Sequence, residues 1–113
     1  MELNINNIEV VGEGSNILEQ TRLANDAYIC AIANNVVEIE PDALSCNHNL
    51  QAVIIPTSVK KIGKCAFDAK EQFSCINIYY LGTTDEWEKI EIDEQIKEVP
   101  CIFCSNGPRI YHI

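Results

Sequence analysis

Apolar and polar residues follow the same order in two consecutive stretches of this chain, 23 positions apart. Residues 36–44 read Val-Val-Glu-Ile-Glu-Pro-Asp-Ala-Leu, and residues 59–67 read Val-Lys-Lys-Ile-Gly-Lys-Cys-Ala-Phe. Further apolar residues coincide at the same offset: Leu50 with Phe73, Val53 with Ile76, and Ile55 with Ile78. The apolar positions match while the residues between them change. A stacked repeat requires this pattern, because each unit presents the same apolar face to its neighbour.

The residue types predict the elements of each repeat. Residues 36–39 are expected to be extended, and Pro41 suits an early position in a single helical turn over 41–44. The main strand of the first unit is expected over 50–55, and that of the second over 75–80, because both are rich in β-branched or aromatic residues. Each unit is therefore predicted to combine short strands with one helical turn.

The N-terminal third, residues 1–33, departs from this pattern. A strand is expected over 3–10, a helix over 16–26 and a buried strand over 28–33. Cys30 keeps the strand register of the repeats, but polar residues stand where the earlier apolar positions should be. Terminal repeats are commonly atypical because one face has no neighbour, so we expect this third to be a modified first unit or cap.

The C-terminal third, residues 81–113, also leaves the pattern. Thr83 or Thr84 is expected to cap a short helix with acidic residues in its first turn. Trp87 and Ile90 lie three positions apart, so they share one face of that helix and can cover the exposed end of the last strand.

The length of 113 residues is typical of one domain. We therefore expect a single domain over 1–113, with an N-terminal cap of strand and helix over 1–33. Two repeats of 23 residues would follow over 34–80, and a C-terminal cap over 81–113.

Residues 53–67 read Val-Ile-Ile-Pro-Thr-Ser-Val-Lys-Lys-Ile-Gly-Lys-Cys-Ala-Phe, which resembles the BspA-type leucine-rich repeat, in outline I-x-I-P-x-S-V-x-x-I-G-x-x-A-F. The copy at 36–44 is looser. Residues 78–87 are similar to the I-x-Y-x-G-T-x-x-E-W segment that often closes such arrays, and 104–107 resemble the C-S/T-D-G turn that follows it. The resemblance spans about 34–107.

This resemblance implies an α/β leucine-rich-repeat-like right-handed solenoid, with short strands on one face and single helical turns on the other. Family members are mostly non-enzymatic proteins thought to bind other proteins or surfaces, often at the microbial cell surface. The chain carries about two full repeats, whereas long arrays are common in the family.

The chain is acidic, with a formal net charge of −9. Such a charge repels phosphate backbones and anionic membrane surfaces, so we expect neither nucleic-acid nor membrane partners. No apolar run approaches the roughly 18 residues of a membrane span. Residues 1–6 lack the basic and apolar regions of a signal peptide, so the expected location is cytoplasmic, or the cell surface if the chain is part of a longer exported protein.

Cys101 and Cys104 form a C-x-x-C motif, which is found in thiol-redox and zinc sites. The motif lies in a segment expected to be extended rather than at a helix N-terminus, and no second cysteine pair stands at zinc-ligand spacing. Most of the six cysteines are expected to be reduced and buried. We accordingly expect no cofactor and no bound metal, and retain Cys101 and Cys104 as an alternative thiol or metal pair.

Tyr79 is the candidate contact residue. Side chains alternate across a strand, so Tyr80 shares the inward face with Ile76 and Ile78 whereas Tyr79 projects outward. An outward tyrosine on a solenoid's strand face suits protein contact. Because no catalytic set stands out, the sequence predicts a non-enzymatic domain for protein–protein interaction or self-association, with a thiol-redox or metal-binding protein as the alternative.

Overall fold

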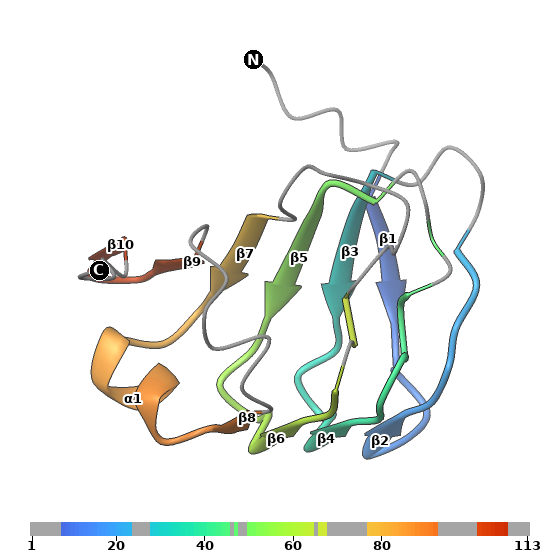
Figure 1. The fold of residues 1–113 in the computed structure, drawn as a ribbon, viewed down its shortest axis with the longest axis horizontal. Coiled ribbons are helices and arrows are strands. Elements are labelled where there is room, and N and C mark those ends of the chain that lie inside the picture. The colour runs from blue at the N-terminus through green and yellow to red at the C-terminus, as the bar shows by residue number, and fades with distance from the viewer. Residues whose placement is uncertain are drawn as a thin grey trace.

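The structure is a computed structural model that describes residues 8–23, 28–45, 47, 50–64, 66–67, 77–92 and 102–108. The chain forms a β-solenoid of about three turns (Figure 1). One sheet, here the long-strand sheet, contains β1 (Ile8–Val11), β3 (Ile29–Ile32), β5 (Ala52–Ile55), β7 (Asn77–Tyr80), β9 (Ile102–Cys104) and β10 (Gly107–Pro108). The other, the short-strand sheet, contains β2 (Ile17–Leu18), β4 (Glu38–Ile39), β6 (Lys61–Ile62) and β8 (Glu91–Ile92). Successive strands alternate between the two sheets until β9, so each turn of the solenoid adds one strand to each sheet.

The repeat register predicted for the central units is confirmed in one step and wrong in the next. Cys30 pairs with Val53, 23 residues later, as the sequence predicts. Val53, however, pairs with Ile78 rather than Ile76, so the following unit is two residues longer. A shift of two keeps the alternation of side chains across the strand, and the predicted inward and outward faces therefore stay correct.

The helix predicted over 16–26 is wrong. Ile17–Leu18 is strand β2, and Leu18 pairs in parallel with Ile39 of β4. The backbone N–H of Val37 donates to the Asn16 carbonyl oxygen at 2.7 Å. Bonding to the next coil thus replaces the bonds of a helix, and burial of Leu18 outweighs local helix propensity. The described part of the N-terminal third stacks as a further coil, with a spacing of 21 residues where the sequence search assumed 23.

The helical turn predicted over 41–44 is also wrong. Asp42 adopts a left-handed φ of 60°, and its N–H donates to the Lys64 carbonyl oxygen of the next coil. The N–H of Leu44 likewise donates to the Ala66 carbonyl oxygen at 2.7 Å. Among the described residues, helix is confined to α1 (Thr84–Glu88). The solenoid is therefore built of short strands and turns, and the α/β leucine-rich-repeat description is not confirmed.

The interior is apolar, and each coil also bonds to the one before it through polar side chains. Val36, Ile39, Val53 and Val59 are fully buried between the sheets. Outside this core, the Asn35 amide donates to the Gly12 and Ser15 carbonyl oxygens at 2.7 Å, and the Ser58 hydroxyl donates to the Val36 carbonyl oxygen at 2.8 Å. These two side chains occupy equivalent positions in successive coils and fix the vertical stacking.

The C-terminal end of the solenoid is closed as the sequence predicts. Thr83 caps α1, and its hydroxyl and backbone form the reciprocal capping box with Glu86. Trp87 and Ile90 are both buried. The Asn106 carbonyl oxygen accepts the N–H of Thr84 at 3.0 Å, which ties the β9–β10 turn to the helix. The inserted helix separates β6 from β8 in sequence while leaving them paired.

Candidate functional site

The outward face of the long-strand sheet carries an unbroken apolar row. Register aligns the five members side by side, one from each of the strands β1, β3, β5, β7 and β9, and they are Val10, Ala31, Ile54, Tyr79 and Phe103. Val10, Tyr79 and Phe103 are 51%, 42% and 40% exposed. Figure 1 shows the long strands side by side, so this row runs across the sheet rather than along one strand. We call these five residues the apolar row.

Two aromatic rings form one end of the apolar row. The rings of Tyr79 and Phe103 stack with centroids 5.3 Å apart and an interplanar angle of 19°. The register places Tyr79 of β7 directly beside Phe103 of β9. Stacking holds both side chains in one arrangement before any partner arrives, which lowers the entropy lost on binding. Tyr79 is thus outward as predicted, whereas Phe103 was overlooked because attention fell on the flanking cysteines.

The short-strand sheet has a different outward face. Glu38, Lys61 and Glu91 align across β4, β6 and β8, so positive and negative side chains alternate. Lys61 and Glu91 form an exposed ion pair at 3.8 Å. Such a ladder is an ordinary solvated surface, and its ion pair adds little stability. The comparison shows that this fold does not by itself require an apolar exterior, so the apolar row is a particular feature of the long-strand sheet.

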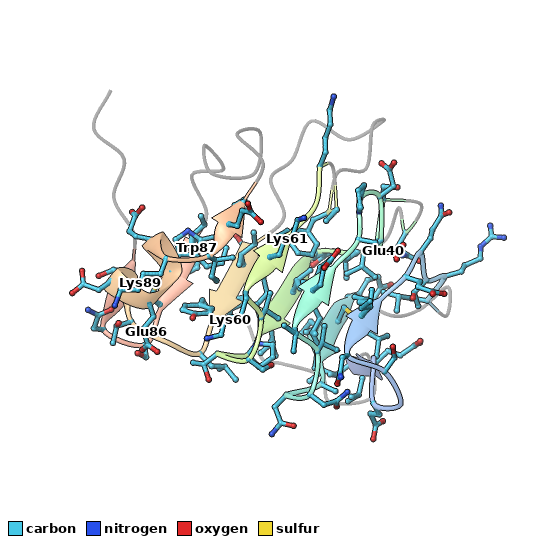
Figure 2. All side chains as sticks on the ribbon, turned by 90° about the horizontal axis from the view of Figure 1, so that it is seen from below. Glu40, Lys60, Lys61, Glu86, Trp87 and Lys89 are labelled. Carbon is cyan, nitrogen blue, oxygen red and sulfur yellow. The ribbon has the colours of Figure 1, made fainter. Side chains whose placement is uncertain are left out.

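A second candidate is a cavity of about 230 Å³ between α1 and the corner that precedes β6. Its lining is mixed: Val59 and Ile90 are apolar, Tyr80 presents a phenol, and Lys60, Lys89 and Glu86 are charged. Figure 2 shows Lys60, Glu86 and Lys89 at the same end of the molecule. Sequence reasoning singled out none of these charged residues, because the inserted helix brings them together outside the repeat pattern.

The predicted thiol pair is only half described. Cys104 is buried on strand β9 and faces inward, and Cys101 lies outside the described residues. Cys30 is also free and buried, and burial raises the pKa of its thiol to about 12, with the Glu9 carboxylate adding to the rise. A reactive cysteine requires exposure and a stabilised thiolate. Neither described thiol meets both conditions.

The search for known chemistry and relatives adds little. Among the described residues, no three His, Cys, Asp or Glu side chains are grouped where they could hold a metal ion. Within the same ranges, no helix has the length and apolar character needed to cross a lipid bilayer. No protein-family model, curated protein or solved structure matches the chain. Any functional assignment therefore rests on the surface chemistry of the solenoid itself.

Proposed function

We propose that this protein is a non-catalytic solenoid domain that binds a protein partner through the apolar row. The observation that carries the proposal is the row itself, because an exposed apolar strip on a sheet whose counterpart is charged marks an interaction surface. The similarity of residues 53–67 to BspA-type repeats supports the same class of function.

The partner expected from charge complementarity is a polypeptide with apolar side chains flanked by lysine or arginine. The chain carries a net charge of −9, so a basic partner is attracted and its association is accelerated at low ionic strength. A second copy of the chain would bring the same negative charge to the same surface. Self-association is therefore the less favoured form of the interaction.

The aromatic end of the apolar row should dominate the binding energy. Tyrosine is among the residues enriched at binding hot spots, where truncation costs about 2 kcal/mol or more, equivalent to roughly thirtyfold in affinity. Tyr79 and Phe103 also lie together, as hot-spot residues commonly do.

The test is selection of displayed random dodecapeptides on the immobilised protein, followed by affinity measurement of the enriched peptides. We expect enrichment of basic residues among apolar ones, and binding roughly thirtyfold weaker to the double variant Tyr79→Ser, Phe103→Ser. Val37→Ser is the control, because Val37 is 44% exposed but stands outside the apolar row. Enriched peptides that bind the double variant as tightly as the parent would contradict the proposal.

Sedimentation of the protein alone separates the two forms of association. A monomer at all accessible concentrations agrees with a basic partner. A dimer that the double variant abolishes would overturn the basic partner and establish the second copy as the occupant of the apolar row.

A further inference from the structure

The cavity beside α1 contains a buried hydrogen-bonding group without a partner. Tyr80 is only 4% exposed and lines the cavity, and its ring packs edge-on against Trp87. Within the described residues, its hydroxyl makes no hydrogen bond, although Tyr and Trp polar atoms usually find a partner when buried. Burial raises the pKa of Tyr80, and the Glu86 carboxylate adds to the rise, so the hydroxyl remains a donor at neutral pH.

Two ammonium groups share this cavity. Lys60 donates to the Thr57 carbonyl oxygen at 3.4 Å, which leaves two of its three N–H groups available. Neither Lys60 nor Lys89 lies within 4.0 Å of a carboxylate oxygen in the described part of the chain. In a protein with 17 acidic and 8 basic residues, two such lysines at one cavity indicate that an anion completes the site.

The remaining lining limits the charge and the body of that anion. Glu86 is held in place because its Oε1 accepts the backbone N–H of Thr83 at 3.1 Å. Its negative charge leaves the cavity with one net positive charge, which suits a monoanion better than a dianion. Val59 and Ile90, both buried, supply an apolar wall. The volume lies below the roughly 300–1,000 Å³ of sites for drug-sized ligands, so the ligand is small.

We propose that this cavity binds a small organic monocarboxylate, with the carboxylate oxygens on Lys60, Lys89 and the Tyr80 hydroxyl and a short aliphatic body against Val59 and Ile90. This site is separate from the apolar row and does not depend on the proposed protein partner. Charge-assisted hydrogen bonds fix the carboxylate, and burial of the aliphatic body adds the apolar contribution.

The experiment is a titration of the ¹⁵N-labelled protein with isobutyrate, followed through the backbone amide shifts of α1 and of the corner that contains Lys60. A ligand of so few atoms is expected to bind with a Kd of about 1 mM to 10 mM. The neutral isostere isobutyramide and inorganic phosphate are titrated in parallel. We expect isobutyrate to bind at least about tenfold more tightly than either, because the amide lacks the charge and phosphate lacks the apolar body.

The variants Lys60→Gln and Lys89→Gln should each weaken isobutyrate binding by about tenfold, and Tyr80→Phe by roughly fivefold. Lys64→Gln is the matched control, because Lys64 is exposed and does not line the cavity. A dispersed amide spectrum for each variant shows that the fold is retained. The absence of saturable shifts up to about 50 mM, equal binding of isobutyramide, tighter binding of phosphate, or an equal loss in Lys64→Gln would each overturn the proposal.

Discussion

Replacement of Asn47 by alanine should be among the most damaging single changes outside the apolar core. Asn47 is 8% exposed and is the buried polar side chain of the described residues. Its Oδ1 accepts the backbone N–H of Leu23 at 2.7 Å, and its Nδ2 donates to the carbonyl oxygens of Thr21 at 2.8 Å and Leu44 at 3.2 Å. One amide therefore joins two adjacent coils.

The magnitude follows from these three bonds. Each contributes about 1 kcal/mol net, and a buried group left without its partner raises the cost, so Asn47→Ala should lower the free energy of unfolding by about 3 kcal/mol. A domain of this size is typically stable by about 6–15 kcal/mol, so the loss is a large fraction of the total. Asn47→Asp keeps the acceptor for Leu23 but loses both donors, and should cost less than half of that if the carboxylate stays hydrated.

Urea unfolding measures the effect. The single tryptophan, Trp87, is 1% exposed, so its fluorescence reports the C-terminal end while far-ultraviolet circular dichroism reports all coils. Asn34→Ala is the control, because Asn34 is exposed and its side chain makes no hydrogen bond in the described residues. A value for Asn47→Ala within about 0.5 kcal/mol of this control would refute the assigned role of the amide.

Two further predictions concern stability. Gly63→Ala should cost about 2–3 kcal/mol in urea unfolding, because an added Cβ would lie 2.7 Å from Cδ of Pro41, whereas Gly14→Ala, with nothing within 4 Å, should change stability by less than about 0.5 kcal/mol; equal effects would contradict the close approach of the coils. The pKa of Cys30 is raised from 9.0 to about 12, so the unfolded chain loses this proton first and stability falls as pH rises from about 9 toward 12. Between pH 8 and pH 10, stability should fall by about 1.4 kcal/mol more in the parent than in Cys30→Ala, and parallel pH profiles would show that Cys30 does not titrate as described.

The sequence predicted the faces of the strands better than their register. Tyr79 lies outward and Tyr80 inward as expected, because alternation depends only on parity and the unit containing them is longer by two residues. The first coil escaped detection for a related reason. Its spacing of 21 residues placed polar Asn16 opposite Ile39 in a search at 23, whereas the apolar partner is Leu18. A search that allowed the spacing to vary would have found it.

The cavity could not have been predicted in this way. Lys60 stands at a repeat position, but Lys89 belongs to the helix inserted between β6 and β8, which has no counterpart in the other described coils. Their meeting depends on how α1 folds back, and that depends on the burial of Trp87 and Ile90. Periodicity reports what coils share, so a site built from an insertion leaves no periodic signal.

The acidic charge and the apolar row are best understood together. An exposed apolar strip favours aggregation, and strong net charge opposes it through repulsion between copies. The inward-facing position of Glu9 on β1, opposite buried Cys30, places a charge on the first strand of the long-strand sheet, a device that discourages edge-to-edge pairing. Charge thus suppresses association between like copies while it attracts a basic partner. The same physical property that keeps the apolar row exposed in solution also selects what binds to it.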